Sequence, residues 1–214
     1  MIKACIFDLD GVIVDTAKYH YMAWKRLADE LNIPFNEKDN ERLKGVSRMK
    51  SLEIILDLGN VNLSQEEKEE LAQKKNNWYV ECISNMDKSE LLPGVEEFIK
   101  NLKRKGIKVA IASASKNTKL ILKKLNLEDT FDAVIDGTMI DKAKPNPEIF
   151  LKASDYLNVK PEECLVFEDA VAGVQAAKKA GMKVIGVGEK KVLKGADKVI
   201  KNFENVDLTL IEGI

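Results

Sequence analysis

The sequence predicts an α/β protein, in which a doubly wound parallel sheet is interrupted by an inserted helical cap domain. Two observations predict this fold. In the second half of the chain, short apolar segments alternate with helical segments, which is typical of a parallel sheet. Residues 17–82 carry only helical patterns, although the apolar, strand-like segment Ile2–Phe7 precedes them. The first strand therefore belongs to the same sheet as the later ones.

The inserted block predicts three helices. Apolar residues recur at helical spacing over Tyr21–Leu31 and again over Leu52–Leu56. Ser64 and Glu67 form the pattern of a capping box, which places the start of a third helix that runs toward Ile83. We expect the cap domain to cover residues 16–87, and the α/β catalytic core to cover residues 1–15 and 88–214.

The core elements follow in a regular order. The patterns predict helix 95–105, strand 108–112, helix 118–125, strand 133–135, helix 147–157, strand 164–167, helix 171–180 and strand 183–187. In such sheets, ligands bind beyond the carboxyl ends of the strands. The residues that follow each strand are therefore the candidates for function.

Composition excludes several classes of protein. Lys and Arg total 34 against 35 Asp and Glu, so the net charge of −1 does not indicate a nucleic-acid-binding protein. Cys5, Cys82 and Cys164 lie far apart and form no CxxC pair, so we expect reduced packing residues. No apolar run approaches the ~18 residues that span a bilayer. We expect a cytoplasmic protein with no membrane or nucleic-acid partner, and we expect a monomer.

Two carboxylates follow the first strand directly, in the sequence FDLDG. Residues two apart on an extended chain point to the same side, so Asp8 and Asp10 can converge on one spot. Two like charges this close shift each other's pKa unless a cation or a division of labour separates them. The pair therefore indicates a metal, a proton-transfer partner, or both.

Polar residues also follow the later strands. Ser113–Asn117 would suit a phosphate at a helix start, although such residues also cap ordinary helices. Lys144 could neutralise a phosphate, although a lone lysine is usually a surface residue. Mg²⁺ takes hard oxygen ligands, and the candidate ligands are Asp8, the Asp10 carbonyl, Glu168 and Asp169. Because all these polar residues are expected at one edge of one sheet, a shared functional role is favoured over separate structural roles.

These four segments together resemble the four motifs of the haloacid dehalogenase superfamily, over essentially the whole chain. The finer match is to the β-phosphoglucomutase family, because cap segments such as LKGVSR (Leu43–Arg48) and QKKNNWY (Gln73–Tyr79) resemble that family too. The resemblance implies interconversion of β-glucose 1-phosphate and glucose 6-phosphate through a β-glucose 1,6-bisphosphate intermediate, with Mg²⁺ as cofactor and a sugar phosphate as substrate.

The resemblance also implies roles for individual residues. Asp8 matches the nucleophile that becomes an aspartyl phosphate, and Asp10 matches the general acid/base. Thr16 and His20 match hinge residues that hold Asp10 in position. Mg²⁺, Lys144 and Ser113 would neutralise the transferring phosphoryl group. The residues matched to the substrate site, besides Asp10 and Ser113, are Trp24, Gly45, Val46, Arg48, Ser51, Lys75, Asn76, Ala114, Ser115, Lys116 and Asn117.

Within this assignment, Arg48 would grip the distal phosphate through its planar guanidinium. Lys75 and Asn76 match cap residues that approach the active site on closure. We expect Trp24 to pack within the cap beside the sugar rather than to bind the sugar itself. Ala170 departs from the pattern, because relatives often carry serine there, and we expect a modest effect on metal affinity.

Two other functions are compatible with the same fold. A phosphatase of the same superfamily would share Asp8, Asp10, Lys144 and the metal, but water would attack the aspartyl phosphate. A binding or scaffold protein on the same fold would need no paired acids with a metal site. An assay that follows glucose 6-phosphate and free phosphate together separates the mutase from the phosphatase.

Overall fold

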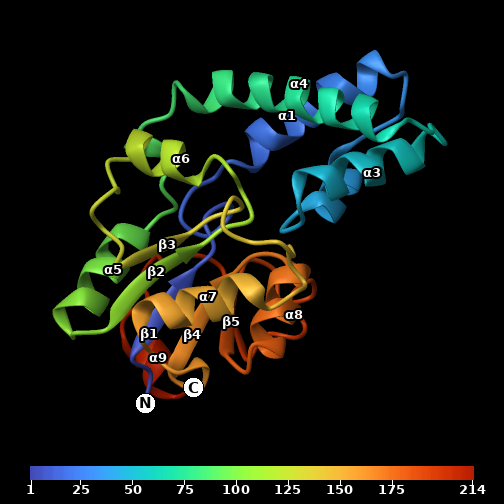
Figure 1. Ribbon diagram of the computed structural model, residues 1–214. Helices are drawn as coiled ribbons and strands as arrows, with labels where there is room; N and C mark the ends of the chain where they lie inside the picture. The colour runs from blue at the N-terminus through green and yellow to red at the C-terminus, as the bar shows by residue number, and fades with distance from the viewer.

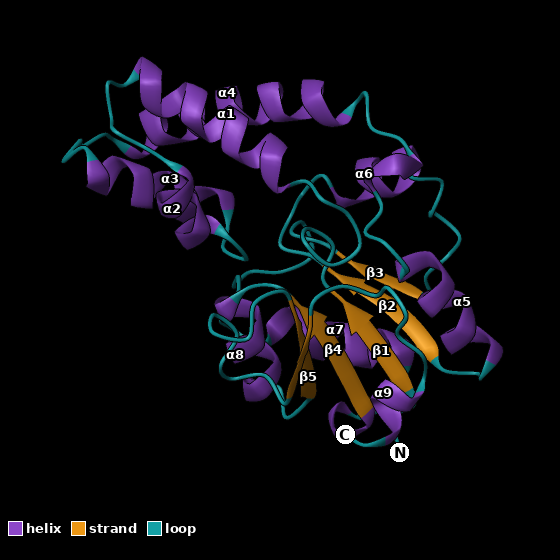
Figure 2. Ribbon diagram, turned by 180° about the vertical axis from the view of Figure 1, so that it is seen from behind, coloured by secondary structure: helices purple, strands orange, loops and turns teal.

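The computed structural model describes all 214 residues and confirms the α/β fold. Its six-stranded sheet is parallel throughout, in the order β3-β2-β1-β4-β5-β6. Figure 2 shows β3, β2, β1, β4 and β5 side by side in this order. The first strand lies in the centre of the sheet, between two strands that follow the helical block in the sequence. The strands are β1 (Ala4–Phe7), β2 (Lys108–Ala112), β3 (Ala133–Ile135), β4 (Cys164–Glu168), β5 (Lys183–Val187) and β6 (Lys198–Ile200).

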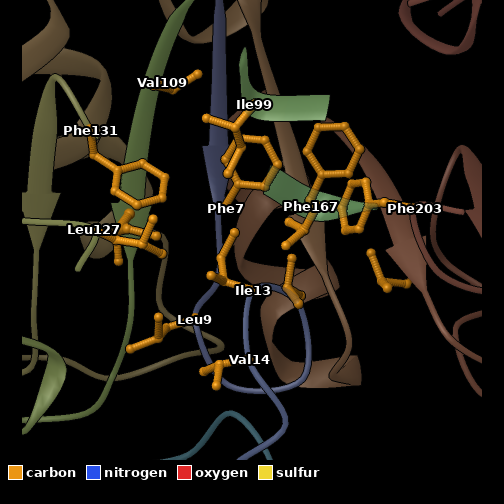
Figure 3. Close-up of a cluster of buried hydrophobic side chains, with 14 of the residues drawn as sticks. Phe7, Leu9, Ile13, Val14, Ile99, Val109, Leu127, Phe131, Phe167 and Phe203 are labelled. Atoms are coloured by element: carbon orange, nitrogen blue, oxygen red, sulfur yellow. The ribbon is translucent and has the colours of Figure 1, made fainter. Parts of the chain in front are cut away.

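Helices cover both faces of the sheet, and the alternation of β1 side chains shows how. Cys5 and Phe7 point to the face packed by α5, α6 and α9, whereas Ala4 and Ile6 point to the face packed by α7 and α8. On the first face, Phe7 stacks on Phe167 with 4.8 Å between ring centroids (Figure 3). The core helices are α5 (Val95–Arg104), α6 (Thr118–Lys124), α7 (Glu148–Leu157), α8 (Val171–Lys179) and α9 (Thr209–Glu212).

A bundle of helices lies over the carboxyl ends of the strands, at the opposite end from both termini (Figure 1). It has its own apolar cluster, which includes Trp24, Leu27 and Ile55 and is separate from the two clusters on the sheet. We propose that this bundle is a cap domain of residues 16–87 inserted into the core. Its helices are α1 (Ala17–Glu30), α2 (Glu37–Asn40), α3 (Arg48–Leu58) and α4 (Gln65–Ile83), with the short 3₁₀ turn η1 (Glu41–Leu43). Two further 3₁₀ turns, η2 (Lys88–Glu90) and η3 (Pro161–Glu163), belong to the core.

The two chain segments that connect the bundle to the core are bonded to each other. The Asp15 N–H donates to the Glu90 carbonyl at 3.1 Å, and the Leu92 N–H donates to the Ile13 carbonyl at 2.9 Å. The Tyr19 hydroxyl also donates to the Glu90 carboxylate at 2.7 Å. These bonds hold together the two strands of chain through which the bundle is joined to the core.

The sequence predicted most elements, and the differences have local causes. The capping box is confirmed, since Ser64 Oγ accepts from the Glu67 N–H and the Glu67 carboxylate accepts from the Ser64 N–H. The first strand begins at Ala4 rather than Ile2. The sequence patterns did not indicate α2, β6 or α9, which have three or four residues each. The three cysteines are free, as predicted. No helix is both long enough and apolar enough to cross a membrane.

Candidate active site

Asp8 and Asp10 lie at the carboxyl end of the central strand, where the chain turns sharply toward the cap. Gly11 makes this turn with a positive φ of 84°, and a Cβ there would lie 2.3 Å from an oxygen of Asp169. Only glycine therefore allows the turn to pass this close to the opposing carboxylate. The sequence of β1 and its turn thus delivers both acids to one point above the sheet.

Lys144 joins the carboxylates that arrive from two different strands. Its buried ammonium forms an ion pair with Asp8, pairs with Glu168 at 2.9 Å and donates to the Ala112 carbonyl at 3.1 Å. Burial alone would lower the pKa of Lys144, but the charges of Asp8 and Glu168 outweigh burial and raise it. Lys144 is therefore a fixed cation beside Asp8, and not a surface lysine.

Three carboxylates face one another at this point. Oxygens of Asp8, Glu168 and Asp169 all lie within 4.8 Å of one another. Burial, followed by the charge of a neighbouring carboxylate, raises the pKa of Asp169. One lysine cannot neutralise three acids, and buried carboxylate oxygens are the ligands that Mg²⁺ prefers. The donor set therefore fits a divalent hard cation.

Asp10 has different surroundings, because its partners come from the cap. The Thr16 hydroxyl donates to Asp10 Oδ1, and His20 Nε2 stands 3.9 Å from the same oxygen. Burial, then the negative charge of Asp8, raises the pKa of Asp10 to about 6, while the Thr16 hydrogen bond opposes this rise. Asp10 is thus poised to exchange a proton near neutral pH.

His20 is held as a neutral ring by its own neighbours. Burial, then the charges of Lys75 and Arg48, lowers the pKa of His20 well below its usual value. Lys75 Nζ lies 3.0 Å from His20 Nδ1. An ammonium can only donate, so the protonated Lys75 places the proton of the neutral ring on Nε2, the nitrogen that faces Asp10. Burial lowers the pKa of Lys75 itself to about 7.

A cavity of about 590 Å³ lies between the cap and the carboxyl edge of the sheet. Of the residues that the sequence predicted for the site, all but three line it; the exceptions are Thr16, Lys144 and Glu168. Each exception is buried and bonded within the site, since Thr16 donates to Asp10, and Lys144 donates to Asp8 and to Glu168. Residues from the first strand, the cap and the later strand ends thus converge in one place.

The loop after β2 supplies polar groups to the cavity, but not in the way the sequence suggested. The N–H groups of Ser115 and Asn117 donate to the hydroxyl oxygens of Ser113 and Ser115, both at 3.1 Å, so these amides are not free for an anion. The hydroxyl proton of Ser113 stays available. The Asn117 side chain donates to Asn76 of α4 at 2.9 Å, which links the core to the cap across the cavity.

Arg48 opens α3 on the cap side of the cavity and is half-buried. It forms no ion pair with any carboxylate, and burial lowers its pKa. A half-buried guanidinium without an acidic partner is suited to a phosphate group. The site therefore has a cation on each side of the cavity wall, Lys144 bonded to Asp8 in the core and Arg48 in the cap.

The cavity also contains residues that the sequence did not single out. Asn40, Lys44 and Tyr79 of the cap line it. Lys44 lies close enough to Asp169 to lower the pKa of that carboxyl group, against the rise caused by burial. The neighbouring Gly45 brings the cap loop close to the core, since a Cβ there would lie 2.9 Å from the Ala170 methyl group. Ala170, the departure noted in the sequence, is thus a contact between cap and core.

Comparison with known proteins agrees with this geometry. The sequence model of the haloacid dehalogenase-like hydrolases matches residues 2–181. The chain is 46% identical to a β-phosphoglucomutase of Bacillus subtilis over 98% of this chain and 93% of that protein. It is 34% identical to a phosphorylated carbohydrates phosphatase of Thermotoga maritima over 86% of this chain and 83% of that one.

A crystal structure of β-phosphoglucomutase from Clostridium difficile has the same fold from end to end. The two structures superpose with a TM-score of 0.95 at 44% identity, covering 100% of this chain and 96% of the other. A match of the family pattern across residues 2–181, together with relatives of this identity over nearly the full length, decides the classification. The chain belongs to the haloacid dehalogenase-like hydrolase family.

Proposed function

We propose that this protein is a β-phosphoglucomutase, which interconverts β-D-glucose 1-phosphate and glucose 6-phosphate by phosphoryl transfer through Asp8. The observation that carries the proposal is the pair of cationic groups at the site, Lys144 bonded to Asp8 at the edge of the sheet and the unpaired Arg48 on the cap side of the cavity. A mutase needs two groups that bind phosphate, because its intermediate carries two phosphates. The likeness to the B. subtilis and C. difficile β-phosphoglucomutases supports the same reading.

The first half of the proposed reaction places a second phosphate on the sugar. In the phosphorylated enzyme, the 6-hydroxyl of β-glucose 1-phosphate attacks the phosphorus on Asp8, and the bond between phosphorus and the Asp8 oxygen breaks. Asp10 accepts the proton of the attacking hydroxyl. A pKa of about 6 suits this step, because the Asp10 carboxylate is then a usable base at neutral pH.

The second half regenerates the phosphoenzyme. The bisphosphate turns end for end, so that its 1-phosphate lies at Asp8 and its 6-phosphate lies at Arg48. Asp8 attacks the phosphorus of the 1-phosphate, and the bond to the sugar oxygen breaks as Asp10 returns its proton to that oxygen. Glucose 6-phosphate leaves, and Asp8 carries the phosphoryl group for the next cycle.

The residues that would hold the proposed magnesium ion are Asp8, Glu168 and Asp169, with the Asp10 main-chain carbonyl. When bound, the ion would neutralise charge on the transferring phosphoryl group. Lys144 and the Ser113 hydroxyl add the chain's own positive and polar groups on the same side. Together these groups hold the phosphoryl oxygens while Asp10 moves the proton.

A sugar-phosphate phosphatase is the second candidate, favoured by the likeness to the T. maritima phosphatase. The assay that separates the two supplies β-glucose 1-phosphate, Mg²⁺ and a trace of β-glucose 1,6-bisphosphate, and follows glucose 6-phosphate and inorganic phosphate. We expect glucose 6-phosphate without stoichiometric phosphate. Phosphate release that matches the loss of substrate would overturn the mutase proposal.

We place the enzyme in the cytosol as a monomer, within the same proposal. Three free thiols, two of them buried, suit a reducing compartment.

A further inference from the structure

Two buried side-chain polar atoms in the chain have no hydrogen-bond partner, and both belong to residues that line the cavity. They are Asn40 Oδ1 and the hydroxyl oxygen of Tyr79. Buried polar groups are paired in the great majority of native structures, so an unpaired one needs a reason. The unpaired hydroxyl of Tyr79 is the more costly of the two, because this side chain on α4 is fully buried.

The ring of Tyr79 holds the histidine of the site. It stacks on His20 with 4.0 Å between ring centroids and an angle of 26° between the planes. Lys75 Nζ lies 4.7 Å from the centroid of the same ring and contacts His20 Nδ1. The stack and the lysine together fix the plane of the imidazole, and thereby the direction in which Nε2 faces Asp10.

Tyr79 belongs to the same group of side chains as Asp10, because its ring stacks on His20, whose Nε2 stands 3.9 Å from Asp10 Oδ1. Burial raises the pKa of Tyr79 well above its usual value, the charge of Asp10 raises it further, and the Thr16 hydroxyl lowers it. The phenol therefore keeps its proton and is a donor without an acceptor. Thr16 Oγ1 gives its only proton to Asp10, which leaves its lone pairs able to accept. The Tyr79 hydroxyl is thus a buried donor without a well-formed hydrogen bond, in a site where Thr16 Oγ1 is able to accept one.

We propose that Tyr79 is a positioning residue for Asp10, which donates its hydroxyl proton to Thr16 Oγ1 in the substrate complex and which orients His20 through its ring. This inference rests on the proposed function. The new bond strengthens the one from Thr16 to Asp10, because linked hydrogen bonds polarise one another. Asp10 is then aimed at the sugar oxygen when the phosphoryl group moves.

The variant that isolates the hydroxyl is Tyr79→Phe, which keeps the stacked ring. We expect an unchanged or higher melting temperature, because an unpaired buried hydroxyl is removed. We expect kcat to fall roughly five- to tenfold, the effect of one hydrogen bond, with KM unchanged. We also expect a larger share of inorganic phosphate among the products. Tyr21→Phe removes a hydroxyl from the same bundle outside the cavity and is the matched control, with wild-type kinetics.

A double-mutant cycle with Thr16→Val shows whether the effect passes through Thr16. If it does, Tyr79→Phe lowers kcat little further in the Thr16→Val background. Wild-type kcat and product ratio in Tyr79→Phe, or full additivity with Thr16→Val, would overturn the inference. If the wild-type enzyme makes no glucose 6-phosphate, the proposed function is wrong, whatever the role of Tyr79. The same double-mutant cycle is then measured on the turnover of acetyl phosphate, and full additivity of the two substitutions would again overturn the inference about Tyr79.

Discussion

Asp8 and Asp10 are two residues apart in the sequence, yet the structure gives them opposite surroundings. Asp8 pairs with the buried ammonium of Lys144 and belongs to the acidic cluster. Asp10 meets a hydroxyl and a neutral imidazole, and burial with the charge of Asp8 raises its pKa to about 6. The first environment favours an anion that attacks, and the second favours a group that carries a proton. The division of labour in the proposed reaction follows from this difference.

The nucleophile assignment predicts that Asp8→Asn abolishes turnover. An amide cannot form the phosphoenzyme, so intact-mass spectrometry after incubation with β-glucose 1,6-bisphosphate should detect no added phosphoryl group. Asp155→Asn, an exposed change on α7, should leave both the phosphoenzyme and the rate as in the wild type. Substantial turnover in Asp8→Asn would show that another residue receives the phosphoryl group.

Gly11→Ala tests the turn that brings Asp10 toward the acidic cluster. The added Cβ would lie 2.3 Å from Asp169 Oδ2, so Asp169 must move, and we expect weaker Mg²⁺ activation and at least tenfold lower kcat. Gly106→Ala is the matched control, because Gly106 also has a positive φ of 74° but no atom within 4 Å of the added Cβ. Both variants should lose about 1 kcal/mol of stability from backbone strain. Equal activity in the two would contradict the assigned contact.

Single residues also mark the limit of what the sequence can predict. The acids and Lys144 were predicted because they follow strands, and strand ends of a parallel sheet share an edge. Neither Tyr79 nor Asn40 follows a strand. Tyr79 stands among apolar residues at helical spacing and reads as core, because the sequence does not show that its hydroxyl is left without a partner.

At the scale of elements, α4 combines a structural face and a functional one. Ala72, Tyr79 and Ile83 form its buried stripe, and Lys75 stands within that stripe although it is a lysine. Its ammonium lies 4.5 Å from the Trp24 ring and 4.7 Å from the Tyr79 ring, which offsets part of the cost of burial. A lysine inside the apolar face of a helix is thus a signal of function that a sequence can display.

This burial predicts a pH-dependent stability. The pKa of Lys75 falls from 10.5 in the unfolded chain to about 7 in the fold, so the unfolded state binds more protons between these values and wild-type stability rises with pH there. Lys75→Met lacks this dependence. The free energy of unfolding of Lys75→Met, relative to that of the wild type, should therefore fall by on the order of 2 kcal/mol from pH 6 to pH 9.

Urea unfolding at the two pH values measures this shift. Lys74→Met removes the neighbouring exposed lysine, which pairs with Glu30 at the surface, and should show no comparable change with pH. The two variants share helix, residue type and substitution, so they differ chiefly in burial. A parallel pH response of both variants would contradict the buried charge.

Elements were predictable where the local signal was strong. The Ser64 capping box fixed the start of α4, and the core strands carried continuous apolar runs. By contrast, β6 has three residues at the edge of the sheet and none is fully buried. It is a strand because β5 offers a free edge, which is a property of the assembled sheet.

At the scale of the whole molecule, the cavity exists because two bodies face each other across a paired connection. The core contributes the acids and Lys144, and the cap contributes Arg48 and the neighbours of Asp10. The Asn117–Asn76 hydrogen bond already crosses the gap. The sequence predicted this two-part arrangement, but the distances across it depend on packing between the parts, which no local pattern encodes.

Arg48→Ala tests the proposed contact of Arg48 with the distal phosphate of the substrate. We expect KM for β-glucose 1-phosphate to rise at least tenfold, because the distal phosphate loses its charge-assisted contact. Phosphorylation of Asp8 by acetyl phosphate, which has no distal phosphate, should be nearly unaffected. Arg42→Ala removes an exposed arginine of the cap outside the cavity and should behave as the wild type. An equal loss with both donors would argue that Arg48 supports the fold rather than the substrate.

In the proposed reaction, a sugar hydroxyl, and not water, receives the phosphoryl group from Asp8. Turnover of β-glucose 1-phosphate in ¹⁸O-labelled water, with mass analysis of the products, distinguishes the two acceptors. We predict glucose 6-phosphate whose phosphate carries no ¹⁸O, with little inorganic phosphate formed. Labelled inorganic phosphate in proportion to the substrate consumed would contradict the account and identify the protein as a phosphatase.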